Sequence, residues 1–178
     1  MTSLTRRQFV AGLLASSAAL SGSALPAFAR EPSPFPAAEA VTARHGMVVA
    51  QEARAARIGA DILKRGGNAV DAAVATGFAM AVTYPRAGNI GGGGFMLIHL
   101  AATGRDIAID YRETAPSATT RETFLNAQGA ADPAKSRDQG LAVGVPGTVA
   151  GLAHAHKAYG SGQFTLAQLI EPATALAR

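Results

Sequence analysis

The stretch AVDAAVATGFAMAV, residues 69–82, is apolar at nearly every position. After Asp71 its one polar side chain is Thr76. A helix that is apolar on all sides belongs inside a protein, and this one is too short to cross a bilayer comfortably. We therefore expect a buried helix, covered by more protein than a chain of this length easily supplies. A shorter apolar run, HGMVVA at residues 45–50, suits a buried strand.

The residues before residue 69 predict where this helix starts and where a preceding helix ends. Asn68 is placed as an N-cap, and Asp71 can complement the exposed amides and the positive end of the helix dipole. Over residues 54–65, charged side chains recur at three- and four-residue steps on one face, and apolar side chains lie largely on the other. This spacing predicts an amphipathic helix. Gly66 and Gly67 end it, since glycine accepts the left-handed conformation.

Downstream, the pattern predicts a β-hairpin. Residues 94–100 and 106–111 are two strand-like runs, joined by a short glycine-containing turn at 102–105. The second run alternates apolar and polar side chains and delivers Arg112 to its end. Arg112 has the parity of Asp110, so both side chains leave the same face of the strand.

The rest of the chain carries weaker signals. Residues 119–125 favour a short helix and residues 126–140 favour a loop. A short strand, a Pro-Gly turn and a helix ending near Tyr159 follow. Residues 165–178 predict a helix, a break at Pro172 and the start of another helix.

The first residues have the three parts of an export signal, and we assign residues 1–29 to it. The basic pair Arg6 and Arg7 precedes a mildly apolar run and a small-x-small cleavage site at residues 27–29. Adjacent arginines before a weakly apolar run resemble a twin-arginine signal. We expect cleavage, no membrane anchor afterwards, and a mature protein in the periplasm or outside the cell. Residues 30–45 begin with a proline-rich stretch and are predicted to be a linker.

Composition excludes several classes of function. The chain has 178 residues, of which 48% are hydrophobic and 16% charged, and it has no cysteine. Disulfides, a cysteine nucleophile and thiolate metal sites are therefore excluded. The net charge is +4. Without Arg6 and Arg7, 14 basic residues stand against 12 acidic ones, and the net charge is +2. The basic residues are scattered, so we expect no nucleic-acid partner.

Two features invite a ligand-binding interpretation that their surroundings do not favour. The glycine run at residues 91–94 follows a predicted helix and precedes a strand, whereas a phosphate-binding loop has the reverse order and a GK[ST] motif. Two interpretations of the glycine run remain: a tight crossing of two backbone segments, or close approach of bare backbone to a ligand. His154 and His156 are two residues apart and do not share a helix face. We expect a solvated helix surface there, with neither a metal nor a cofactor.

Arg112 allows two interpretations. It can form a structural ion pair with Asp110 or Glu113, and spacing alone favours that role. A planar guanidinium at a strand end can also hold a carboxylate through two parallel hydrogen bonds.

Four motifs together indicate a family. In order, they are RGGNAVDAAVA at residues 65–75, NIGGGGFM at 89–96, DYRETAP at 110–116 and AVGVPGTVAGL at 142–152. Their order and spacing resemble the N-terminal part of the γ-glutamyltransferases, also called glutathione hydrolases. The resemblance runs over residues 46–178.

The resemblance implies an α+β fold of the N-terminal nucleophile hydrolase class, an αββα sandwich that is incomplete in this chain. It implies a proenzyme that cuts itself into a large and a small subunit. The new N-terminal threonine then attacks γ-glutamyl compounds such as glutathione, and water, an amino acid or a peptide takes the acyl group. The arginine of the RETAP motif binds the α-carboxylate of the γ-glutamyl group, a role that falls on Arg112. For the glycines at residues 91–94 it implies a packing or site-adjacent role.

Family members continue for several hundred residues beyond this length. We therefore expect residues 46–178 to be the N-terminal portion of the large subunit. The chain then contains no catalytic residue, since the threonine lies downstream, and the small subunit is a missing partner. Alone, it is expected to be inactive. The alternative is a truncated, catalytically inactive homologue that acts only as a binding or structural module.

Overall fold

The structure is a computed structural model, and it describes residues 39–178. Contacts divide the chain into two units, Met1–Thr42 and Ala43–Arg178. In the first unit only residues 39–42 are described, and they are exposed and outside any helix or strand. The predicted export signal and most of the predicted linker lie outside the described residues, so both stay predictions.

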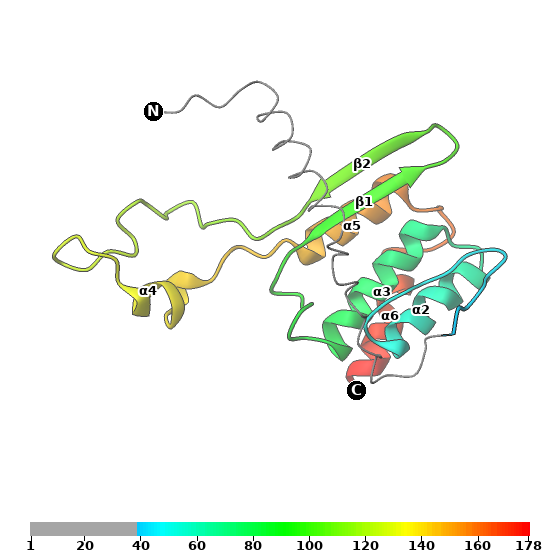
Figure 1. Cartoon of the computed structure of the whole chain (residues 1–178), viewed down its shortest axis with the longest axis horizontal. Helices are drawn as coiled ribbons and strands as arrows, with labels where there is room; N and C mark the ends of the chain where they lie inside the picture. The colour runs from blue at the N-terminus through cyan, green and yellow to red at the C-terminus, as the bar shows by residue number, and fades with distance from the viewer. Residues whose placement is uncertain (1–38) are drawn as a thin grey trace, which may run out of the picture. The chain divides into compact units, whose positions relative to one another are not determined.

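Helix α3 (Ala69–Thr83) lies in the core of the second unit (Figure 1). It contacts α2 (Ala53–Lys64), α5 (Thr148–Tyr159) and α6 (Leu166–Ala177). This confirms the prediction of a buried helix, because α3 is covered by helices from both ends of the unit. The apolar side chains of α3 that are buried in the core are Val70, Ala72, Val74, Ala75, Phe78 and Ala79.

The predicted helix boundaries are confirmed by their hydrogen bonds. The Asn68 side chain accepts from the Asp71 amide at 2.9 Å, and the Asp71 carboxylate accepts from the Asn68 amide at 3.1 Å. Two of the amides that a helix start leaves open are thus satisfied reciprocally. At the end of α2, Gly66 has a φ of 93°, the left-handed conformation expected there.

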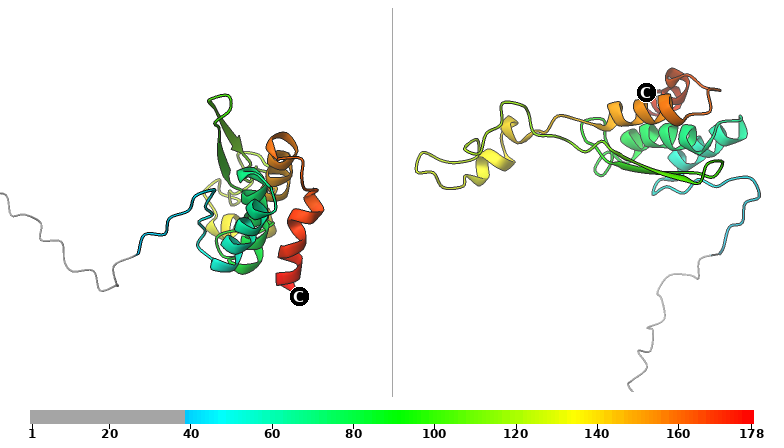
Figure 2. Two further views of the ribbon diagram at one scale, coloured as in Figure 1. Left: turned by 90° about the vertical axis from the view of Figure 1, so that its right-hand side faces the viewer. Right: turned by 90° about the horizontal axis from the view of Figure 1, so that it is seen from above.

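The predicted hairpin is confirmed as β1 (Phe95–Leu100) paired antiparallel with β2 (Arg105–Asp110). One face is covered by the helices, and Figure 2 shows the two strands running beside α3 and α5. The opposite face is exposed along β1. The side chains directed to the helices are Met96, Ile98, Leu100, Ile107 and Ile109.

Between the hairpin and α5 the chain makes an excursion over residues 115–144, away from the helices (Figure 1). Its two ends are joined by a β-bridge between Thr114 and Val145. The predicted strand before the Pro-Gly turn is wrong apart from this bridge. The loop predicted for residues 126–140 is also wrong in part, since it contains helix α4 (Pro133–Arg137) and leads into the 3-10 helix η1 (Gly140–Ala142).

The short helix predicted at residues 119–125 is wrong, because threonine side chains occupy the backbone amides there. The Thr120 amide donates to Thr123 Oγ1 at 2.8 Å, and the Glu122 amide donates to Thr120 Oγ1. Such local bonds compete with helical ones. A consecutive run of turns results.

Two further predictions are corrected by tertiary context. Residues 45–50 are irregular rather than a buried strand, and Val49 is 84% exposed, because within residues 39–178 no third strand lies there to pair with them. Pro172 does not break its helix, since α6 is continuous through it. Leu169 and Ala173, on either side of Pro172, are buried in the core, and this packing offsets the lost hydrogen bond.

Candidate functional site

Arg112 lies just past the end of β2 in an extended segment. Tyr111 continues the strand pairing, since its amide donates to the Gly94 carbonyl at 3.0 Å and its carbonyl accepts from the Gly94 amide. The Arg112 amide donates to Asp110 Oδ1 at 3.0 Å. The backbone on the N-terminal side of Arg112 is therefore fixed, while its side chain is 62% exposed.

Arg112 forms an ion pair with Glu113, one of the two acids named from spacing. Its Nε donates to Glu113 Oε2 at 3.1 Å. The backbone amide of Glu113, together with the hydrogen bond and charge of Arg112, holds the pKa of the Glu113 carboxyl below its usual value. The Glu113 carboxyl is therefore ionised at neutral pH. No other side-chain hydrogen bond of Arg112 occurs within residues 39–178, which leaves the two terminal nitrogens available for a ligand.

The glycine run forms the tight crossing expected of it. A Cβ added at Gly93 would lie 2.5 Å from the Tyr111 carbonyl oxygen and 2.8 Å from the Glu113 amide nitrogen. Backbone atoms cannot move aside as a flexible side chain can, so a side chain is excluded at Gly93. The order of elements, α3 before the run and β1 after it, also rules out a phosphate-binding loop.

The start of α5 fixes the glycine run from a second direction. The amides of Gly147 and Thr148 both donate to the Gly92 carbonyl, at 2.9 and 3.0 Å. The Thr148 hydroxyl donates to the Asn89 carbonyl at 2.9 Å. These amides are occupied by the chain itself, so the arrangement positions residues 111–113 rather than binding an anion.

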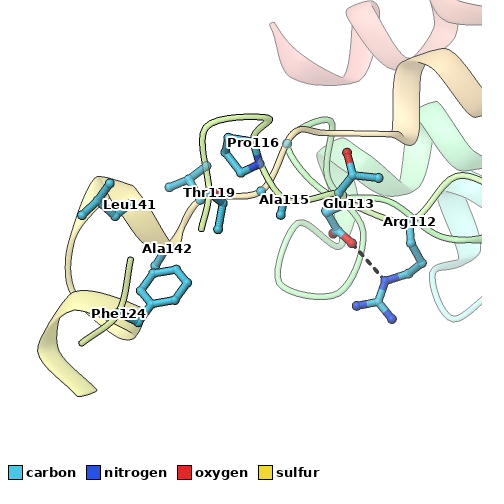
Figure 3. Close-up of a pocket in the computed structure, with 12 residues that line it drawn as sticks. Arg112, Glu113, Ala115, Pro116, Thr119, Phe124, Leu141 and Ala142 are labelled. Atoms are coloured by element: carbon cyan, nitrogen blue, oxygen red, sulfur yellow. Dashed lines mark hydrogen bonds and ion pairs between the residues drawn. The ribbon is translucent and has the colours of Figure 1, made fainter. Parts of the chain in front are cut away.

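An open pocket of about 540 Å³ lies beside Arg112. In Figure 3, Arg112 and Glu113 lie at one end of the labelled residues, while Phe124 and Leu141 of the excursion lie at the other. The pocket therefore combines a charged end with an apolar wall. Its lining residues are Gly91, Arg112, Glu113, Thr114, Ala115, Pro116, Thr119, Phe124, Leu141, Ala142, Val143 and Gly144.

The interpretation of His156 as a solvated residue is wrong. His156 is half-buried, and its Nδ1 lies 3.2 Å from Oδ1 of Asp71, which is fully buried. Burial raises the pKa of Asp71, but hydrogen bonds from Ser161, Asn68 and His156 outweigh this and hold that pKa below its usual value. Sequence spacing had no signal for this contact, because the two residues are far apart in the chain. His154 is exposed, as expected.

The part of the chain that the structure describes has neither a cluster of metal-binding side chains nor a helix suited to span a membrane. Residues 39–178 contain no group of three or more His, Asp or Glu side chains arranged to hold a metal ion. In the same residues no helix is long and apolar enough to cross a membrane.

The fold is a partial α+β fold of the N-terminal nucleophile hydrolase class, with helices on one face of a small sheet. The sequence profile described as gamma-glutamyltranspeptidase matches residues 55–178. The chain belongs to the gamma-glutamyltranspeptidase family, as the four motifs predicted.

Named relatives of this chain support the same family assignment. The chain is 49% identical over 172 residues to the glutathione hydrolase proenzyme of Escherichia coli strain K12, which covers 93% of this chain and 29% of that protein. The crystal structure of Helicobacter pylori gamma-glutamyltranspeptidase matches with a TM-score of 0.74 and 49% identity, over 79% of this chain and 39% of that one. The enzyme from Pseudomonas nitroreducens, complexed with L-DON, matches with a TM-score of 0.71 and 47% identity, over 77% and 40%. The chain thus spans less than a third of the length of the E. coli relative.

Proposed function

We propose that residues 46–178 are the N-terminal portion of the large subunit of a γ-glutamyltransferase, or glutathione hydrolase, and that Arg112 holds the α-carboxylate of the γ-glutamyl group. The observation that carries this proposal is the exposed guanidinium at the charged end of the pocket, on a backbone fixed by its neighbours. A carboxylate and a guanidinium match through two parallel hydrogen bonds.

The ion pair with Glu113 is compatible with this role. It uses Nε of Arg112, and in Figure 3 the two terminal nitrogens project beyond the dashed contact. A substrate carboxylate can therefore join the pair without displacing Glu113. Because Glu113 is ionised, it neutralises Arg112 in the empty site and limits non-specific attraction of anions.

The remaining chemistry belongs to residues beyond this chain. A threonine exposed by autocleavage attacks the γ-carbonyl carbon, the amide C–N bond breaks, and the threonine proton passes through its own α-amino group to the leaving amine. Water or an amine acceptor then takes the γ-glutamyl group from the threonine. In this scheme the chain supplies recognition and its partner, the small subunit, supplies the nucleophile. Alone, it is inactive. Residues 1–29 direct export to the periplasm or beyond.

The first test is the change Arg112→Ala in the full-length proenzyme. Losing a charge-assisted bidentate contact costs about 2–4 kcal/mol, so kcat/KM for a γ-glutamyl anilide should fall about 30- to 900-fold. Autocleavage should continue, since Arg112 acts on substrate rather than on processing. Arg105→Ala, at the exposed start of β2, is the matched control. Unchanged turnover in Arg112→Ala would exclude the carboxylate role.

The alternative, an inactive binding or structural module, is decided by the coding DNA past Arg178. An open frame that leads to a threonine-initiated small subunit supports the enzyme, and an authentic stop codon supports the module. A chimera gives an independent answer. Residues 46–178 would replace the matching segment of the E. coli proenzyme, and autocleavage followed by glutathione hydrolysis would show that this segment is competent.

A further inference from the structure

We infer that Phe95 is a positioning residue for Arg112, an inference that rests on the proposed carboxylate role of Arg112. The pairing register of the hairpin places Phe95 beside Arg112. Phe95 lies opposite Asp110, and Arg112 is two residues further along from Asp110 with the same parity. Phe95 and Arg112 are therefore diagonal neighbours on one face of the hairpin, a spacing that aromatic and long side chains can bridge.

The side chains meet across that diagonal. The guanidinium carbon of Arg112 lies 5.9 Å from the centroid of the Phe95 ring, within the range of a cation–π contact. The backbone beneath the ring is held by the strand pairing of Phe95 with Asp110, and the Tyr111 hydroxyl also donates to the Phe95 carbonyl at 3.5 Å. The ring thus has a defined place beside the guanidinium.

Phe95 supplies a restraint that the other neighbours of Arg112 do not. Glu113 holds Nε, and Asp110 holds the backbone amide. Neither contact uses the face of the guanidinium plane, and a long arginine side chain loses rotamer freedom when it is held in one place. A ring against the guanidinium limits this freedom before substrate arrives and leaves the two terminal nitrogens free to donate.

The exposure of Phe95 has a competing explanation, which the chain itself allows us to test. Phe95 is 62% exposed and Leu97, on the same face, is 85% exposed. Both could simply be apolar surface that other protein covers. Leu97 lies opposite Ala108, one outward-facing pair further from Arg112, so it shares the surface but not the guanidinium.

The experiment measures steady-state kinetics of the full-length proenzyme with a γ-glutamyl anilide. Phe95→Leu should raise KM about 2- to 5-fold with kcat changed less, as expected for loss of an exposed cation–π contact. Phe95→Tyr should retain the wild-type KM because it keeps an aromatic face. Leu97→Ala is the matched control and should leave KM unchanged, and autocleavage yield reports folding of every variant.

A double-mutant cycle separates positioning from general packing. In the Arg112→Ala background, Phe95→Leu should have no further effect on kcat/KM, because the group it positions is gone. An equal loss in both backgrounds, or an unchanged KM in Phe95→Leu, would overturn the inference. If Arg112→Ala itself leaves turnover unchanged, the proposed function fails. If only Phe95→Leu is silent, the inference alone fails.

Discussion

The Asp71–His156 contact and the Arg112–Glu113 ion pair lie in opposite environments. The first joins α3 to α5, and Asp71 has no solvent exposure. The second joins neighbouring residues that are 62% and 33% exposed beside a pocket. Asp71 is surrounded by donors from its own protein, whereas Arg112 keeps two donor nitrogens without a side-chain partner among residues 39–178. A buried pair with its hydrogen bonds satisfied holds elements together, and an exposed pair with unused donors can bind.

The largest expected effect on stability is at the buried pair. Asp71→Ala removes the acceptor for Asn68, Ser161 and His156 and leaves donors unpaired. We expect the free energy of unfolding to fall by roughly 3 kcal/mol, measured by urea titration of the full-length proenzyme. Glu113→Ala is the comparison. It should leave the urea midpoint nearly unchanged, and equal losses in the two variants would contradict the distinction.

A second change tests whether the exposed site depends on its backbone support. Gly93→Ala would push a methyl group against the carbonyl of Tyr111 and the amide of Glu113, so the two backbone segments that cross there must move apart. We expect about 2 kcal/mol of lost stability together with a lower kcat/KM for a γ-glutamyl anilide.

Gly88→Ala provides the matched control for that experiment. Its added Cβ would lie 4.0 Å from Met80 Cβ, an ordinary contact, and Gly88 does not line the pocket beside Arg112. It should therefore retain stability and turnover. A Gly93→Ala variant as active as Gly88→Ala would show that the crossing does not position Arg112.

The smallest expected effect is on how the stability of the protein depends on pH in the acidic range. The pKa of Asp71 is lowered in the folded protein from an ordinary value of 3.8. A lowered folded pKa contributes stability that is present above 3.8 and is lost as pH falls through the folded value. Asp71→Asn, which does not titrate, should therefore lose less stability than wild type over that acidic range. Parallel pH dependence of unfolding in the two proteins would argue against an ionised Asp71.

Local chemistry explains which parts of the fold were predictable. Caps such as Asn68, the glycine at 66 and the alternation in β2 act within a few residues, so the sequence alone located α2, α3 and the hairpin. The start of α4 carries an equally clear local signal, which the loop prediction did not take into account. Asp132 caps it and Pro133 opens it, a standard helix start within a segment interpreted as a loop.

Contacts between residues far apart in the sequence explain the features that local patterns did not predict. Pro172 is tolerated because its neighbours are buried, and His156 is paired because Asp71 faces it from another helix. Neither fact is contained in a local pattern. At the candidate site, sequence spacing named Glu113 as a possible ion-pair partner of Arg112, and the structure confirms that pair, but the two α5 amides on Gly92 required the tertiary fold.

The bridge between Thr114 and Val145 has a consequence for how this protein can diversify. Its two backbone hydrogen bonds, of 3.3 and 2.8 Å, close the segment 115–144 into a loop with a fixed base. The entropic cost of closing a loop rises only slowly with its length, so insertions and deletions here disturb the base little. Phe124 and Leu141, which face Arg112 across the pocket, both belong to this segment. Insertions and deletions can therefore change the wall of the pocket while the backbone that carries Arg112 stays in place.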